Sequence, residues 1–222
     1  MIIGNGLIAN SLRKIDSDKI LFFASGVSNS LEMRNSEFER EFSLLKESIT
    51  NNSGVKVIYF STLSIFDRSK KDSPYVIHKK NIEDYITENL ENFLILRIGN
   101  IVGKGGNPNT LFNFLKSKIE NQSQFAVHTN ARRLLIDIDD ISKFLSLLLT
   151  YNQNQVINCA YPYYYTPKEI IDVIQSETKK IANYDEIDEG DFYRVHFNNE
   201  IERFFSETNP TEYLEFLAKK YI

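Results

Sequence analysis

Short runs of consecutive apolar residues recur along the first half of the chain, separated by longer segments of mixed polarity. The runs are MII at 1–3, KILFFASG at 19–26, VIYF at 57–60 and FLILRI at 93–98. They are rich in β-branched and aromatic residues, and continuous runs of this length are typical of strands buried on both faces of a sheet. We therefore expect four buried strands in this part of the chain.

Helical periodicity fills the segments between these runs. Residues 36–52 place apolar side chains three or four positions apart, and Ser36 with Glu39 matches the capping box that begins many helices. Further helices are predicted near 75–90, 110–119 and 212–221. Strands that alternate with helices in this way predict an α/β fold with a doubly wound parallel sheet.

Composition and charge narrow the class of partner. The chain has 222 residues, 42% of them hydrophobic, and a formal net charge of −4, which suits one folded domain and argues against a nucleic-acid partner. Cys159 is the only cysteine, so no internal disulfide can form, which favours a reducing, cytoplasmic location. The apolar runs are too short for a membrane span. His78, His128 and His196 lack the spacing of metal ligands, so no metal site is expected.

A glycine-rich turn follows the first apolar run. In dinucleotide-binding turns, the first glycine makes the tight turn and the second lets the backbone approach a pyrophosphate, while a small third residue lets the helix pack closely on the strand. The same pattern also occurs in turns without a ligand, but its place at the start of an α/β chain favours a nucleotide site. The segment that matches the G-x-G-x-x-G/A pattern is Gly4-Asn5-Gly6-Leu7-Ile8-Ala9.

The second apolar run ends in small residues where a dinucleotide fold usually has an acid. That acid follows the second strand, about twenty residues after the glycines, and binds the adenosine ribose. Here the region reads Ala24-Ser25-Gly26-Val27-Ser28. Either the ribose is bound differently or a strand–helix–strand segment is deleted. Small residues at a strand end suit a backbone that lies close to a cofactor, which favours the deletion.

A tyrosine and a lysine four residues apart follow the third apolar run. Tyr75 and Lys79 share one face of the helix that Pro74 introduces, and Thr62 lies at the end of the preceding strand. A nearby ammonium lowers the pKa of a tyrosine, and a hydroxyl from the strand end can bind the same substrate oxygen. Tyr-x-x-x-Lys also occurs by chance on surface helices. The strand end before it and the glycine turn favour a catalytic role.

Together these motifs make the chain resemble the extended short-chain dehydrogenase/reductases, the NAD-dependent epimerase/dehydratase family, with some similarity to the dTDP-4-dehydrorhamnose reductase branch. The resemblance covers nearly the whole chain and implies a Rossmann-like fold, here shortened. It implies a single domain over 1–222, with a dinucleotide-binding core over 1–110 and a mostly substrate-binding part over 111–222 that is interleaved with the last strands. The later segments that carry it are 96–103, 133–140, the strand at 156–160 and the helix start at Thr166 and Glu169.

The resemblance also implies roles for particular residues. Thr62, Tyr75 and Lys79 would be catalytic, and Lys79 would also bind the nicotinamide ribose. Asn100 and Arg133 would contact a nucleotide-sugar substrate. The cofactor, NADP or NAD, would lie against Gly4, Asn5, Gly6, Leu7, Ile8, Ala24, Ser25 and Gly26.

The activity implied by the resemblance is that of an NAD(P)-dependent keto-sugar reductase or epimerase acting on a nucleotide-activated sugar, as in the synthesis of surface-polysaccharide precursors. The family also implies a homodimer that forms through the helices at 36–52 and 75–90. Leu63 and Ser64 stand where sugar 4,6-dehydratases have an acidic pair, so water elimination is not expected.

The missing ribose acid leaves an alternative open. Without it we expect weak dinucleotide binding, with NADPH bound as well as or better than NADH and with Arg13 as the nearest basic residue to a 2′-phosphate. The alternative is a cofactor-free, non-catalytic binding or regulatory protein that keeps the short-chain dehydrogenase fold. The joint presence of the three catalytic residue types argues against that alternative.

Overall fold

Five parallel strands, among the described residues 1–149 and 154–222, form the central sheet of the computed structural model. All neighbouring strands pair in parallel, for example Phe22 with Ile58 and Ile58 with Leu94. The predicted doubly wound parallel sheet is confirmed. The strands lie in the order β1 (Ile2–Ile3), β2 (Ile20–Phe23), β3 (Lys56–Thr62), β4 (Phe93–Ile98) and β8 (Gln155–Cys159).

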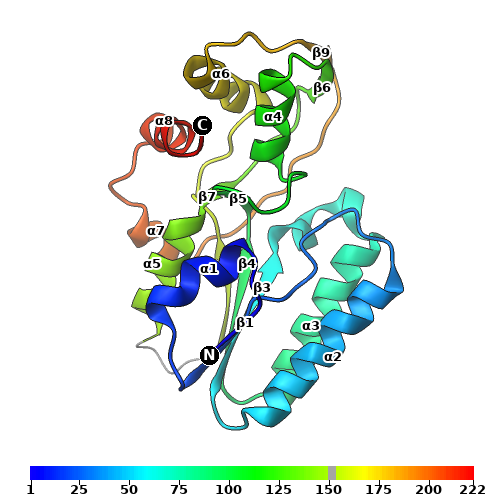
Figure 1. Cartoon of the computed structure of the whole chain (residues 1–222), viewed down its shortest axis with the longest axis vertical. Coiled ribbons are helices and arrows are strands. Elements are labelled where there is room, and N and C mark those ends of the chain that lie inside the picture. The colour runs from blue at the N-terminus through cyan, green and yellow to red at the C-terminus, as the bar shows by residue number, and fades with distance from the viewer. Residues whose placement is uncertain (150–153) are drawn as a thin grey trace.

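Helices cover both faces of this sheet (Figure 1). On one face, α2 (Asn35–Asn51) and α3 (Pro74–Asn89) lie side by side and pack against Phe23 and Tyr59. On the other face, α1 (Leu7–Ser11), the 3₁₀ helix η1 (Leu12–Ile15) and α5 (Ile138–Leu148) pack against Phe22 and Ile58. Successive strand residues thus serve opposite layers of the core, which is why the strands are continuous apolar runs.

The first strand lies at an edge of the sheet. Within the described residues β1 pairs with β2 alone, and only a few residues separate η1 from β2. The chain therefore passes from the glycine turn to the second strand of the sheet without a further strand and helix between them. This agrees with the deletion that the sequence favoured.

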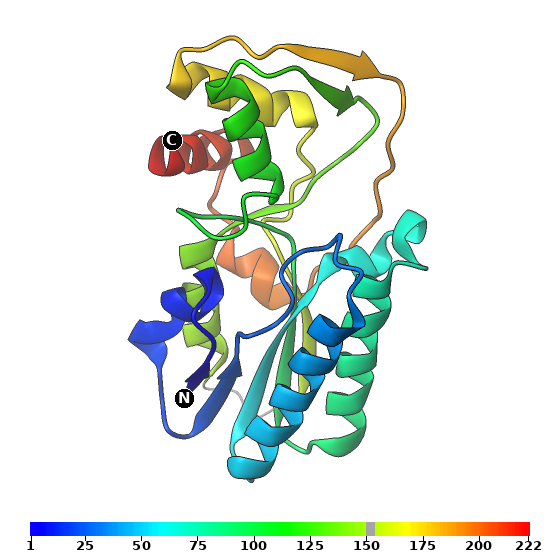
Figure 2. The same ribbon diagram turned by 45° about the vertical axis from the view of Figure 1, so that its right-hand side comes forward.

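A smaller lobe sits beyond the carboxyl ends of the strands (Figure 2). Two short parallel pairs support it, β5 (Asn100–Val102) with β7 (Leu135–Asp137) and β6 (Phe125–His128) with β9 (Tyr184–Ile187). Its helices are α4 (Leu111–Glu120), α6 (Pro167–Thr178) and α8 (Pro210–Tyr221), and α7 (Asn199–Phe204) lies nearer α5. Residues 100–102 form β5 because they pair with β7, a strand far along the chain.

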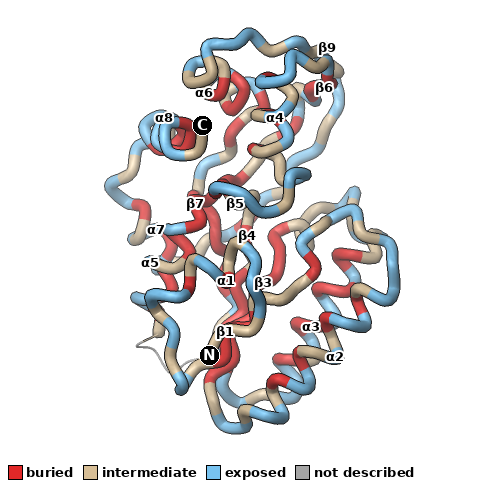
Figure 3. Tube along the Cα trace, in the orientation of Figure 1, coloured by how far each residue is buried: buried red, intermediate tan, exposed pale blue. Residues whose placement is uncertain are grey.

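Burial follows these layers (Figure 3): buried residues follow the strands and the inner sides of the helices, and exposed residues lie on their outer sides. The described helices include none that is both long and apolar enough to cross a membrane.

Two helix starts that the sequence predicted have different outcomes. Thr166 and Glu169 form a complete capping box at the start of α6, with the Glu169 N–H donating to Thr166 Oγ1 at 3.1 Å. The capping box predicted at Ser36 is wrong. Helix α2 begins one residue earlier with Arg34 as its N-cap, so Ser36 lies inside the first turn and the described N-cap makes no side-chain hydrogen bond.

Thr166→Ala should therefore destabilise the protein by about 1 kcal/mol, because one N–H at the start of α6 loses its acceptor. Urea unfolding would measure the change. Ser36→Ala is the matched control and should leave the free energy of unfolding nearly unchanged. Equal losses in the two variants would contradict the assignment of the caps.

Candidate active site

A cavity of about 930 Å³ lies at the carboxyl ends of the central strands. Ligands of open α/β sheets bind in this place, because the loops that follow parallel strands meet there. The described residues that line it come from the glycine turn, from the segment after β2, from the ends of β3 and β4, and from α3. They include Asn5, Gly6, Leu7, Ile8, Ala24, Ser25, Gly26, Thr62, Tyr75, Lys79 and Asn100.

The three predicted catalytic residues meet in one wall of this cavity. Thr62 is the last residue of β3, and Tyr75 and Lys79 lie on the first two turns of α3, which begins at Pro74. All three are nearly buried, with exposures of 8%, 8% and 2%. The Lys79 ammonium lies 5.9 Å from the centre of the Tyr75 ring. A phenol, an ammonium and a hydroxyl therefore face one ligand-sized space.

Opposing influences set the acidity of Tyr75. Burial raises the pKa of the phenol above its usual value, whereas the Lys79 charge and a hydrogen bond with the Thr62 side chain act to lower it, and Glu41 acts to raise it. The net shift is upward. Tyr75 is thus a protonated phenol at neutral pH.

The glycine turn is held by close backbone packing. Gly4 has φ +125°, and a Cβ there would lie 2.5 Å from the carbonyl oxygen of Ala24, so the turn can lie this close to the end of β2 only with glycine. Gly4 itself supports the turn from outside the cavity lining. Gly6, in contrast, has room for a side chain, since none of the described atoms outside its immediate chain neighbours lies within 4 Å of the place a Cβ would take. The Gly6 backbone therefore borders open space at the start of α1.

A fully buried glutamate, Glu41, pairs with Lys79, and the sequence patterns did not identify it. Its Oε1 accepts hydrogen bonds from Lys79 Nζ and from the Tyr59 hydroxyl, each at 2.8 Å. Its Oε2 accepts the backbone N–H of Val27 at 2.6 Å and lies 3.0 Å from His78 Nε2. Burial alone would raise the pKa of Glu41, but the Lys79 charge and these hydrogen bonds lower it to about 2. Glu41 is therefore a carboxylate.

Gly26 makes room for this group. A Cβ on Gly26 would lie 2.7 Å from Lys79 Nζ and 2.9 Å from Glu41 Oε1. Of the predicted cofactor residues, Ala24, Ser25 and Gly26 all line the cavity, and Gly26 also admits the buried ion pair. The signal that could have found Glu41 is its place between Phe38 and Leu45, where a charged residue falls on the apolar stripe of α2.

The two predicted substrate residues differ in position. Asn100 lines the cavity, and its side-chain amide donates to the Leu134 carbonyl at 3.1 Å. Arg133 lies outside the described lining, with its guanidinium donating to the backbone carbonyl of Arg132 at 2.9 Å. Tyr193, which the sequence analysis did not single out, does line the cavity. Burial, followed by the charge of Asp67, raises the pKa of Tyr193 to about 12, and the charge of Arg133 acts against that rise.

The basic residues at the cavity also differ from those expected. Arg13 is exposed on η1 and lies outside the lining, whereas Arg34 and Arg40 line it. Arg40 lies within 3.5 Å of the Ser25 carbonyl, and Arg34 pairs with Glu32 at 2.8 Å. Both arginines have acidic partners, because Glu32 also lines the cavity and Glu37 lies 3.3 Å from Arg40.

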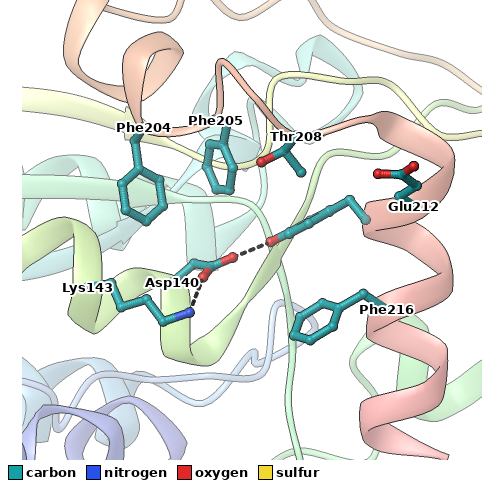
Figure 4. A pocket seen from close by; sticks show the side chains of 8 residues that line it. Asp140, Lys143, Phe204, Phe205, Thr208, Glu212 and Phe216 are labelled. Carbon is teal, nitrogen blue, oxygen red and sulfur yellow. Dashed lines mark hydrogen bonds and ion pairs between the residues drawn. The ribbon is translucent and has the colours of Figure 1, made fainter.

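A second cavity of about 310 Å³ lies between α5 and α8 (Figure 4). Asp140 lines this cavity and accepts hydrogen bonds from the Tyr213 hydroxyl and from Lys143, each at 2.9 Å. Phe204, Phe205 and Phe216 also line it. The Asp140 carboxylate is thus occupied by structural bonds. Among the described residues, no group of His, Cys, Asp and Glu is arranged to hold a metal ion.

Comparisons with known proteins found similar overall folds among solved structures. No protein-family model and no curated protein sequence matches the chain. UDP-N-acetylglucosamine 4-epimerase from Methanobrevibacter ruminantium M1, in complex with UDP-N-acetylmuramic acid, has a TM-score of 0.72 at 20% identity, and the match covers 99% of this chain and 81% of that chain.

Two further structures carry a dinucleotide. UDP-glucose 4-epimerase from Thermus thermophilus, in complex with NAD, has a TM-score of 0.71 at 13% identity, covering 91% of this chain and 77% of that chain. RMD from Pseudomonas aeruginosa, complexed with NADPH, has a TM-score of 0.70 at 12% identity, covering 91% and 80%. The chain therefore has the Rossmann-like fold of the NAD-dependent epimerases and dehydratases, the extended short-chain dehydrogenase/reductases. At these identities the likeness shows the fold alone.

Proposed function

We propose that the protein is an NAD(P)-dependent oxidoreductase that acts on a nucleotide-activated sugar, as a keto-sugar reductase or an epimerase. The observation that carries the proposal is the convergence of Thr62, Tyr75 and Lys79 with the glycine turn on one cavity. A binding module has no need of a buried phenol beside a buried ammonium. The solved structures with the same fold are described with UDP-sugars, NAD and NADPH, which supports this class of ligand.

The side chains divide the work of a carbonyl reduction. A bound nicotinamide supplies the hydride. The protonated Tyr75 donates the proton to the carbonyl oxygen, and the Thr62 hydroxyl orients that oxygen by a hydrogen bond. Lys79 has three N–H donors; two are held by Glu41 and Tyr59, which leaves one in the described structure for a ribose hydroxyl in the cavity.

The residues of the turn fit a dinucleotide. The open space at Gly6 lets its backbone approach a pyrophosphate, as in dinucleotide-binding turns. The segment after β2 has no acid at 24–28 to bind the ribose, and Arg34 and Arg40 bring positive charge to the cavity. Both features suit a 2′-phosphate, so we propose that NADPH binds as well as or better than NADH. Arg34 and Arg40 replace Arg13 as the basic residues in this proposal.

The nucleotide sugar would occupy the part of the cavity nearest the small lobe. Asn100, Ser64 and Tyr193 present polar groups there. Arg133 remains a candidate for the diphosphate, since its charge is close enough to Tyr193 to influence that phenol. Leu63 and Ser64 in place of an acidic pair favour reduction or epimerisation over dehydration.

One observation supports the alternative of a non-catalytic protein with this fold. The edge position of β1 removes the strands that usually flank the glycine turn, so the adenosine end of a dinucleotide has less protein to contact among the described residues. This lowers the expected affinity. The buried catalytic residues still favour the enzyme.

We also propose a cytoplasmic homodimer that forms through α2 and α3. Apolar side chains on the outer surfaces of these helices support it. Ile77 is 46% exposed, and Phe42, Leu44 and Tyr85 are partly exposed. A four-helix contact would cover them.

Tyr75→Phe should lower turnover by roughly 100-fold or more, because it removes the proton donor and little else. Turnover would be measured with NADPH and a panel of nucleotide-linked keto sugars. Tyr163→Phe, on the surface away from the cavity, is the control and should keep the wild-type rate. Equal rates for wild type and Tyr75→Phe on the substrate that the panel identifies would exclude Tyr75 as the acid.

Gly6→Ala should lower the affinity for reduced dinucleotide by about tenfold or more, because the new methyl group points into the space proposed for the pyrophosphate. Fluorescence titration with NADPH and NADH would measure it. Urea unfolding should show a loss of less than about 1 kcal/mol, since the site of the methyl group is open in the free protein. Unchanged affinity would place the cofactor elsewhere, and no binding by the wild type would favour the non-catalytic alternative.

A further inference from the structure

Glu41 has no part in the proposed chemistry, yet it is the most connected buried charge at the site. Its side chain is fully buried on α2, and its carboxylate joins three other parts of the chain. Lys79 and His78 reach it from α3, Tyr59 from β3, and the Val27 N–H from the segment after β2. Burying a carboxylate costs free energy even when it is well paired, and apolar packing in its place would stabilise the fold at least as well. Stability alone therefore does not explain Glu41.

The geometry fixes the position of Lys79. The ammonium donates to Glu41 Oε1 at 2.8 Å and to the Tyr59 hydroxyl at 3.1 Å, and Gly26 leaves the space that this arrangement needs. Lys79 still lines the cavity. The Lys79 side chain is therefore fixed in the wall of the cavity, and its remaining N–H can donate to a ligand there.

The same geometry limits the charge that Tyr75 experiences. The Lys79 ammonium lies 5.9 Å from the Tyr75 ring centre, and its counter-charge lies 2.8 Å from the ammonium. At such a spacing the carboxylate offsets part of the effect of the ammonium on Tyr75, and the effect of Lys79 stays the larger of the two. The other titratable groups packed around the pair are His78 on α3 and Tyr59 on β3, while the segment after β2 contributes the Val27 backbone N–H.

We propose that Glu41 is a positioning residue: it holds the Lys79 ammonium in place and offsets part of its charge beside Tyr75, so that Tyr75 is still protonated when a keto sugar binds. This inference rests on the proposed function and selects the reductase over the epimerase. An epimerase must first oxidise its substrate, so its tyrosine has to accept the proton of an alcohol as the hydride leaves. A reductase needs the tyrosine protonated at the start. Burial is the main cause of the upward shift of the Tyr75 pKa, and the charge of Glu41 acts in the same direction.

Ultraviolet titration of tyrosinate in the free protein tests the offset directly. Each protein is compared with its own Tyr75→Phe version, so that the difference isolates Tyr75 from the other tyrosines. Glu41→Gln removes the offset and should lower the Tyr75 midpoint by about one pH unit. An unchanged or raised midpoint would overturn the proposal.

A control separates this effect from loss of stability. Glu83→Gln removes a different buried carboxylate, one that lies on α3 and pairs with Arg97 in the described structure. It should destabilise the protein, as Glu41→Gln does, but leave the Tyr75 midpoint unchanged. A midpoint that falls equally in both variants would mean that loosened packing is responsible, and would overturn the proposal.

A double variant keeps the test valid if Glu41→Gln does not fold. Glu41→Gln with Lys79→Met removes both charges together, which is less disruptive than leaving one of them buried alone. Because Glu41 offsets part of the effect of Lys79, the Tyr75 midpoint should rise by no more than about one pH unit above the wild type. A rise well beyond one unit would show that Lys79 acts on Tyr75 without compensation, and would overturn the proposal. These titrations need no cofactor, so they can fail while dinucleotide binding, which tests the proposed function, succeeds.

Discussion

A buried carboxylate requires partners, and in this chain that requirement ties the walls of the main cavity together. Glu41 joins α2 to α3 through Lys79, to β3 through Tyr59, and to the segment after β2 through the Val27 N–H. Such a pair adds little net stability compared with apolar packing, but removing one partner costs about 3–5 kcal/mol because the other charge is left buried. The elements that carry the proposed catalytic side chains are therefore held in one arrangement.

The second constraint is the close approach of the glycine turn to β2. Gly4 packs against the Ala24 carbonyl so closely that any side chain would collide with the backbone. In the described structure the turn thus sits directly beside the strand end whose small residues line the cavity, although β1 lies at the edge of the sheet. The shortened half of the fold keeps the glycine turn beside this strand end, and among the described residues no further strand of the sheet lies beyond β1.

Sequence patterns predicted the strands and helices whose formation depends on neighbouring residues in the chain. The apolar run at 93–98 became β4 with the same bounds, and Pro74 begins α3 as expected. The side chains that depend on distant partners were not predictable in this way. In the sequence, Glu41 is one polar residue within the apolar stripe of a helix. Its role depends on Lys79, which is distant in the sequence and contacts it only in the folded protein. Arg133 was expected to contact substrate only because its segment resembles a family motif, and in the structure its guanidinium donates to a backbone carbonyl outside the described cavity lining.

We propose that the glycine turn and the cavity wall formed by Tyr75 and Lys79 bind one dinucleotide between them. A crystal structure of the protein with NADPH tests this most directly. We expect the pyrophosphate to lie against the Gly6 backbone and a ribose hydroxyl to accept a hydrogen bond from Lys79 while Lys79 stays bonded to Glu41. The nicotinamide ring should lie close enough to Tyr75 for a carbonyl carbon to fit about 3–3.5 Å from the hydride position. A dinucleotide bound away from this wall, or a Lys79 that leaves Glu41 to reach it, would contradict the account.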